Sequence, residues 1–487
     1  MSKGSGMRKN KRGTHVLAAL TGAIAVVLAA GTAVAGYDST PGDPVLAAAP
    51  SATSVESAST LVCDGGIART IQGGINIENV DEEITGWAGA FGTPEATFAP
   101  GGAGSSQTFD GALPASAAGT SSLGVPELTG TLEVAGGIVA GASTHSASAG
   151  DLRAVAVNPC QWSTNTAWLV GGSSEVGSSL QLTVTNPGLT QVSIAASAFS
   201  SRGELDLGAN SMLHLAPGTS QTVLLDGLLP ADPRIALRLF SDTGPFTASL
   251  QTSALDGVTP AGVDVVTNSD VGTDLVIPGL VIDSQPGSGD DATLPDPATT
   301  SALRVVNPNE DSATVQISVV GEDGTSPLPG GSDVAVAGGS VLDLTLDGLA
   351  PGAYAIEVES SADISAAVSA TRTDDAGRDV AWLAAHEPIA DAGAAAIGPL
   401  EARLVLIGSS QATWSAYDES GERVSERDVR VDGVTTIEIP IEARFVVVSA
   451  DTELYGSVWI SSDDGVAAVP LTQDSSTSQA VTLTVQN

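Results

Sequence analysis

Two segments of this 487-residue chain recur 121 residues apart, which constrains the fold to a tandem arrangement of similar units. Asn186-Pro187 returns as Asn307-Pro308 (307 − 186 = 121), and residues 223–230 return as residues 344–351 (344 − 223 = 121). A third, degenerate copy begins at Leu404. The chain is therefore predicted to contain three related units.

Short runs of alternating apolar and polar residues fill each copy, for example at residues 180–184, 315–319 and 435–439. Alternation with a period of two predicts strands with one buried face. Asp-Gly and Asn-Pro-Gly steps bound these runs, and no window shows a capped amphipathic helix. The sequence therefore predicts an all-β fold. Because only 3% of the residues are aromatic, the cores have to be built from Val, Leu, Ile and Ala.

The length of each copy, about 75–85 residues, favours tandem immunoglobulin-like β-sandwiches. The alternative is a propeller-like β ring, whose repeats would be about 40–50 residues long. The predicted boundaries are 1–36 for a signal peptide or signal anchor, 37–60 for a spacer, 61–170 for an N-terminal β region, 171–283 for repeat 1, 284–300 for a linker, 301–397 for repeat 2, and 398–487 for the degenerate repeat 3.

The N-terminus carries the pattern of an exported protein. An apolar run at residues 16–36 precedes the first acidic residue, Asp38, and follows five basic residues: Lys3, Arg8, Lys9, Lys11 and Arg12. A basic end before a run long enough to cross a bilayer predicts an extracytoplasmic body. Ala33-Val34-Ala35 fits a signal-peptidase site, so cleavage after Ala35 and retention as a membrane anchor both stay open. A buried Ala-rich helix is a third alternative.

Beyond these basic residues the chain is strongly acidic. It carries 13 arginines (18 − 5), no lysine and 56 carboxylates, so its formal net charge is −43 (−38 − 5). Such a body repels nucleic acid and anionic lipid, so we expect no nucleic-acid partner and membrane contact only through the N-terminal segment. The excess charge serves solubility outside the cell, or it attracts cations or basic partners.

The two cysteines agree with export. Cys63 and Cys160 both follow the apolar run, and an even pair in an oxidising compartment predicts one disulfide. That bridge would tie the first strand of the N-terminal region to its last. Two buried thiols and a metal site are the alternatives, and the metal site is disfavoured because neither cysteine has a Cys-x-x-Cys partner or a nearby histidine.

Sequence patterns that carry catalysis are missing. There is no Gly-x-Ser-x-Gly, no His-Glu-x-x-His, no phosphate-binding loop and no dinucleotide fingerprint. The four histidines are scattered, which favours ordinary surface or satisfied histidines: His15, His145, His214 and His386. The sequence therefore predicts no enzyme, no catalytic residue, no cofactor and no metal site.

Acidic clusters and tryptophans leave two binding hypotheses. Carboxylates cluster at residues 81–83, 290–291, 309–311, 374–375 and 463–464, without the spacing of a known calcium loop, so calcium binding stays open. The tryptophans near repeat ends favour core packing, with a stacking platform for polysaccharide as the alternative: Trp162, Trp168, Trp382, Trp414 and Trp459.

Three motifs resemble a known family. They are residues 61–63 (LVC) after a spacer, residues 151–153 (DLR) leading to Cys160, and residues 168–172 (WLVGG) leading to residues 185–188 (TNPG). This arrangement resembles, over residues 55–472, a large actinobacterial family of secreted or membrane-anchored proteins that carries only a domain-of-unknown-function label. The resemblance implies an envelope-associated, all-β protein without assigned activity. The chain departs from the family at Asp64-Gly65, where a Pro-Gly-Pro turn is usual.

Two classes of function follow. The first is a non-catalytic, extracytoplasmic cell-envelope protein with a structural or protein-interaction role. The second is an envelope polysaccharide-binding module. The partner is then an envelope protein or a cell-wall glycan, which the sequence does not name.

Overall fold

The computed structural model describes residues 59–67, 82–92, 96–100, 106–109, 111–112, 119–120, 126–127, 129–134, 137–282, 300–346, 348–374 and 377–473. These residues form strands and one short 3-10 helix, η2 (Gly208–Ser211), which confirms the all-β prediction. No helix in this part of the chain is long and apolar enough to cross a bilayer. The apolar run at residues 16–36, the spacer up to residue 58 and most of the linker at residues 284–300 lie outside the described residues.

Three sheets come from the N-terminal region. The first contains, in order of pairing, β11 (Gln161–Trp162), β1 (Ser59–Asp64), β8 (Thr129–Val134), β3 (Ala96–Pro100) and β4 (Gln107–Phe109). The second contains β10 (Ala154–Pro159), β9 (Ile138–Ala147), β2 (Glu82–Phe91) and β5 (Gly111–Ala112). The third is the pair β6 (Gly119–Thr120) and β7 (Pro126–Glu127).

The two largest sheets come from residues 166–473. One contains β12 (Thr166–Val170), β18 (Ala236–Phe240), β14 (Val192–Ser200), β26 (Ser340–Thr345), β22 (Ala302–Asn307), β27 (Gly352–Asp374), β23 (Ala313–Gly321) and β24 (Gly324–Pro327), with β15 (Gly203–Leu205), β16 (Met212–Leu215), β21 (Val271–Ile282), β25 (Val334–Val336) and β28 (Gly377–Ala384) beside them. The other contains β34 (Val466–Pro470), β33 (Leu454–Ser461), β30 (Ala402–Tyr417), β32 (Phe445–Ala450), β29 (Ala392–Ala396) and β35 (Thr472–Gln473), with β31 (Arg423–Glu438) beside β30. A four-stranded sheet contains β17 (Thr219–Leu224), β13 (Ser178–Asn186), β19 (Thr247–Asp256) and β20 (Thr259–Val266).

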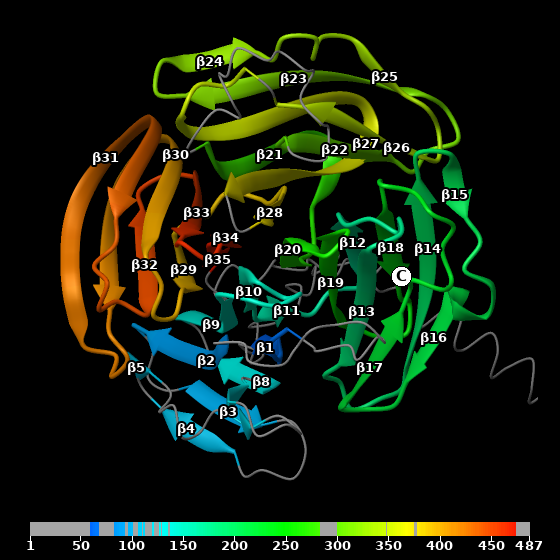
Figure 1. Ribbon diagram of the computed structural model, residues 1–487. Coiled ribbons are helices and arrows are strands. Elements are labelled where there is room, and N and C mark those ends of the chain that lie inside the picture. Colours follow the sequence, from blue (N-terminus) through cyan, green and yellow to red (C-terminus); the bar gives the residue numbers. More distant parts are fainter. Residues whose placement is uncertain are drawn as a thin grey trace, which may run out of the picture. The chain divides into compact units, whose positions relative to one another are not determined.

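Four antiparallel hairpins organise these sheets: β9–β10, β19–β20, β27–β28 and β33–β34. Their second strands, here called the ring strands, contact one another in a closed cycle, β10 to β20, β20 to β28, β28 to β34, and β34 to β10 (Figure 1). The first hairpin belongs to the N-terminal region. That region therefore contributes a hairpin of the same kind as the three repeats.

The sheets do not confirm separate immunoglobulin-like sandwiches. Strand β14 of repeat 1 pairs with β26 of repeat 2 at Ser200 and Ser340, so one sheet contains strands from both repeats. The long strand β27 pairs with β21 and β23 in its first half and with β22 and β28 in its second half. Strands shared in this way couple neighbouring repeats through backbone hydrogen bonds.

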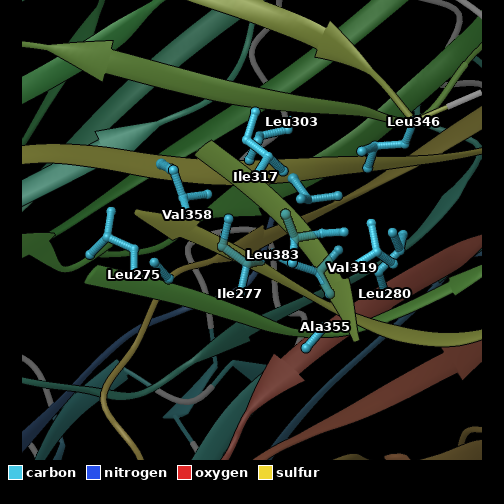
Figure 2. Packing of buried hydrophobic residues seen from close by; sticks show 14 of the residues in the cluster. Leu275, Ile277, Leu280, Leu303, Ile317, Val319, Leu346, Ala355, Val358 and Leu383 are labelled. Atoms are coloured by element: carbon cyan, nitrogen blue, oxygen red, sulfur yellow. The ribbon is translucent and has the colours of Figure 1, made fainter. Parts of the chain in front are cut away.

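Aliphatic side chains fill the cores, as the low aromatic content requires. The largest cluster joins β21, β22, β23, β27 and β28, and Figure 2 shows Leu275, Ile317, Val358 and Leu383 packed together there. Burying each such side chain contributes about 1.5–3 kcal/mol. The alternation noticed at residues 315–319 corresponds to β23, whose odd-numbered residues are buried in this cluster.

The predicted disulfide is confirmed. Cys63 and Cys160 are bridged, with their Cα atoms 4.3 Å apart. Cys63 lies on β1, and Cys160 lies between β10 and β11, which pairs with β1. Both cysteines are buried in a small core with Leu61, Phe98 and Leu132. The bridge therefore ties the start of the N-terminal region to its end, as expected.

Candidate functional site

One carboxylate joins all four ring strands. Asp379 on β28 accepts hydrogen bonds from the backbone N–H of Val155 on β10 (3.1 Å), Val263 on β20 (3.2 Å) and Val466 on β34 (2.9 Å). The side chain is 2% exposed. Because an unpaired backbone N–H is costly when it is buried, these three hydrogen bonds stabilise the contact between the ring strands.

A second buried aspartate lies on the neighbouring ring strand. Asp264 on β20 accepts a hydrogen bond of 2.6 Å from the backbone N–H of Trp382 on β28. Burial raises the pKa of Asp264 well above its usual range, and the charge of Asp379 adds to this effect. Burial likewise raises the pKa of Asp379 to about 7, although four backbone N–H groups act to lower it.

The close approach of the strands depends on small residues. A Cβ atom at Gly465 would lie 1.9 Å from Oδ2 of Asp379 and 2.6 Å from the backbone nitrogen of Val155. A Cβ atom at Gly262 would lie 2.6 Å from Val380, and this glycine has a φ of +118°. Only glycine fits these two positions without a shift of the ring strands.

Arginines connect neighbouring hairpins through backbone carbonyls. Arg153 donates from Nη2 to the carbonyl oxygen of Asp463 (2.9 Å), and Arg378 donates from Nε to that of Ala261 (3.3 Å). Arg372 donates from Nη1 to Ser461 Oγ (3.1 Å) and to the carbonyl oxygen of Ser462. A guanidinium has five donors in a fixed plane, which suits several acceptors at once.

Arg304 on β22 donates hydrogen bonds to residues of both repeat 1 and repeat 2. Its Nε and Nη2 donate to the two carboxylate oxygens of Asp343, both at 2.9 Å. The remaining donors bind the carbonyl oxygens of Gly172 (2.6 Å), Pro233 (2.8 Å) and Ile235 (3.2 Å). The guanidinium carbon also lies 4.9 Å from the centre of the Trp382 ring. Arg304 is 4% exposed, so this is a fully paired buried cation.

A polar groove lies where the N-terminal region meets the last repeat. We call it the seam groove. It has a volume of about 530 Å³, within the range of ligand sites. One wall is made by β2 and β9, where Glu83 is opposite Ser146 and Thr85 is opposite Thr144. The full lining is Glu83, Thr85, Thr144, Ser146, Arg372, Pro399, Leu400, Glu401, Arg403, Ile441, Ser461, Ser462, Asp463 and Asp464.

Hydrogen bonds cross the seam at this groove. Ser146 on β9 donates from Oγ to Oδ2 of Asp464 (3.4 Å), in the turn between β33 and β34. That turn also receives Arg153 and Arg372, and Val466 at its end binds Asp379. The turn at residues 462–465 therefore lies in both the groove and the ring.

The described histidines do not form a catalytic group. His145 is buried, with Nδ1 at 3.2 Å from Glu82 Oε1 and Nε2 at 3.1 Å from the Leu152 carbonyl oxygen. His214 is exposed on β16, with Nδ1 at 3.0 Å from Ser193 Oγ. His386 binds the Glu387 carbonyl oxygen, and burial lowers its pKa. The three lie on different elements with different partners, and His15 is outside the described residues.

The acidic clusters are divided between turns and the groove. Glu83, Asp463 and Asp464 line the seam groove, whereas Glu82 turns inward to His145. Asp81, Asp290, Asp291 and Asp375 lie outside the described residues. Within the described part of the chain, no three His, Cys, Asp or Glu side chains are placed to share a metal ion.

None of the six tryptophans is exposed. Trp168, Trp414 and Trp459 are 2–3% exposed, and the other three are half-buried: Trp87, Trp162 and Trp382. Trp87 donates from Nε1 to Thr85 Oγ1 and lies under the guanidinium of Arg444. This arrangement agrees with the core-packing interpretation. It gives no open aromatic face for stacking on a sugar.

Sequence reasoning missed the ring aspartates and the inter-repeat arginines. The available signal was an acidic residue inside an apolar run, as in Val263-Asp264-Val265, and again at Asp379 shortly before Val380 and Trp382. A charge placed among buried strand residues is rarely tolerated without partners.

Comparison with known proteins identifies the family. A family of unknown function, DUF5719, matches residues 116–442. The chain belongs to this family. The expected relation to a family that carries only a domain-of-unknown-function label is therefore confirmed, over a shorter range than residues 55–472. No curated protein matches this DUF5719 member.

Solved structures show only weak similarity. The structure of infectious bursal disease virus Gx strain is 16% identical, with a TM-score of 0.13 over 81% of this chain and 82% of that chain. Native alpha-2-macroglobulin from Escherichia coli, spanning domains MG0-NIE-MG1, is 12% identical, with a TM-score of 0.11 over 62% of this chain and 96% of that chain. Both scores are too low to support a shared fold.

Proposed function

We propose that this protein is a non-catalytic, extracytoplasmic protein of an actinobacterial cell envelope, with a structural or protein-interaction role. The observation that carries the proposal is the ring centre, where Asp379 binds the three other ring strands and occupies the space between them. A closed, internally paired ring makes a rigid platform. Its polar groups hold the strands together.

The export pattern supports the location. Basic residues precede the apolar run at residues 16–36, and the disulfide between Cys63 and Cys160 is of the kind that persists in oxidising compartments. In this proposal the N-terminal segment is retained as an anchor or cleaved after Ala35, and residues 59–473 act outside the membrane. The partner is an envelope protein.

For the architecture, we propose a propeller-like ring of four units rather than a row of independent sandwiches. The closed cycle of ring strands supports this choice, because separate sandwiches would have no reason to share an inner ring. Each unit contains a hairpin whose second strand is a ring strand. The unit length exceeds that of ordinary propeller blades because each repeat adds further strands outside its hairpin.

The polysaccharide-binding alternative loses its original support, since the tryptophans are packed inside. It now depends on the seam groove, whose hydroxyl groups suit polar ligands. A single experiment separates the two functions. Full-length tagged protein, purified in detergent, is incubated with envelope proteins and, in a separate experiment, with purified cell wall.

We expect recovery of a stoichiometric envelope protein and no retention on cell wall. Retention on cell wall that soluble wall polysaccharide competes away would support the alternative instead. Protease added to intact spheroplasts should digest residues 59–473, and full protection would contradict the location. Turnover of esters, peptides or glycans that is abolished by one substitution in the groove would contradict the non-catalytic role.

A further inference from the structure

The seam groove carries more negative than positive charge. Among its lining residues, four are carboxylates and two are arginines, which gives a formal sum of −2. The carboxylates are Glu83, Glu401, Asp463 and Asp464. A concave site with one dominant sign of charge concentrates ligands of the opposite sign. The charge of the groove therefore selects for a cation.

The arginines of the groove already have partners. Arg372 binds Ser461, Ser462 and Gly465, and Arg403 pairs from Nε with Glu438 at 3.0 Å. By contrast, the side chains of Glu83, Glu401 and Asp463 receive no hydrogen bond from any residue that the structure describes. These three side chains are exposed, so they are available to a ligand.

The arrangement does not suit a single metal ion. Within the described residues, no three acidic side chains converge closely enough to share one. The carboxylates come from different parts of the wall: Glu83 from β2, Glu401 from the segment before β30, and Asp463 from the β33–β34 turn. Spaced carboxylates fit a ligand with more than one separate positive group.

The groove also has an apolar lip. Pro399, Leu400 and Ile441 line it, and Ile441 is 53% exposed. Lysine and arginine side chains combine an aliphatic stem with a charged end, so a lip of this kind can cover the stem while a carboxylate takes the charge. An inorganic cation or a simple polyol would leave this lip unused.

We propose that the seam groove binds a lysine- or arginine-bearing peptide segment of a partner protein. The proposal rests on the proposed function and names the chemistry of the partner. The carboxylates of Glu401 and Asp463 bind the basic groups, and Leu400 and Ile441 contact the aliphatic stems. The hydroxyl of Ser146, which donates to Asp464, lines the same groove.

The test uses a fluorescent pentapeptide, Gly-Lys-Gly-Lys-Gly, titrated with the full-length protein at low salt. The wild type should bind it, and acetylation of both lysines should abolish binding while keeping the stems. The double substitution Glu401→Gln/Asp463→Asn should weaken binding about tenfold. The control Glu204→Gln/Asp242→Asn removes two exposed carboxylates elsewhere and should change binding less than about twofold.

Equal weakening by both double variants would overturn the proposal, because it would mean general attraction to an acidic protein. Equal binding of the acetylated peptide would overturn it as well. Carbodiimide coupling of the bound peptide, mapped by mass spectrometry, should give cross-links at Glu83, Glu401 or Asp463, and cross-links spread over other acids would count against it. If the wild type does not bind the peptide but still recovers an envelope protein, the inference about the seam groove is refuted and the proposed function is not. Recovery of no envelope protein would refute the proposed function.

Discussion

Ionisation of Asp379 sets a pH-dependent part of the stability. Its pKa is about 7 in the folded protein and 3.8 as the ordinary value, because burial disfavours the charged form. The folded state therefore binds this proton more tightly than the unfolded state. The stabilisation by this bound proton is fully present below about pH 4 and is lost as the pH rises to about 7. The difference between the two pKa values corresponds to about 4 kcal/mol.

The substitution Asp379→Asn measures this contribution, because it keeps the size of the side chain and removes its ionisation. The stability is measured by urea unfolding, followed by tryptophan fluorescence, from pH 5 to pH 8. This pH range lies above the isoelectric point of about 4.1. Over this range the stability of the wild type should fall by about 2–3 kcal/mol relative to the variant. Asp242→Asn is the control, since it removes one exposed charge and thereby corrects for general repulsion.

A stability difference between wild type and Asp379→Asn that stays constant from pH 5 to 8 would refute the reasoning. It would mean that the backbone N–H groups outweigh burial and that Asp379 is ionised throughout. Asp264 is the other titrating group on the ring strands, and its pKa is raised partly by Asp379. The double variant Asp264→Asn/Asp379→Asn should therefore lose more of the pH dependence than either single variant.

Three further perturbations test the contacts between repeats and the disulfide, each measured by chemical unfolding. Arg304→Lys should destabilise the protein by about 3 kcal/mol, because three donors replace five in a buried ion pair, and a loss below about 1 kcal/mol would contradict the network. Gly465→Ala should cost about 3 kcal/mol through contact with Asp379, whereas Gly227→Ala, with open space around it, should cost little. Reduction, or the change Cys63→Ser, opens a loop with a sequence separation of 97 and should cost about 4–5 kcal/mol; an unchanged unfolding midpoint would contradict this.

The strands of repeats 1 to 3 could be predicted because many of them have one buried face. Period-two alternation is visible wherever one face contacts the core and the other contacts water, as in β23. The hairpin of the N-terminal region lacks that signal. Strand β9 is buried on both faces over most of its length, and β10 is buried throughout, so their sequences show small residues without alternation.

The ring centre could not be predicted from local sequence. The donors to Asp379 are separated from it by 224, 116 and 87 residues. Before the hairpins are known to meet, an aspartate in a strand near a turn has the same pattern as one on a solvated face. The same holds for the seam groove, which joins residues 83–146 to residues 372–464. Such sites depend on contacts between segments that are far apart in the chain.

After Lys11 the chain uses arginine and no lysine, and its buried arginines suit the contacts between repeats. Buried cations such as Arg153 and Arg304 each serve acceptors on neighbouring repeats, which a lysine with three donors and a more easily shifted pKa serves poorly. These arginines donate to carbonyl oxygens of neighbouring repeats, and Arg304 also pairs with the half-buried carboxylate of Asp343. Glu401 and Asp463 make no ion pair with any residue in the described part of the chain. Because several such acids line one groove, that groove is the part of the surface at which we expect a basic partner.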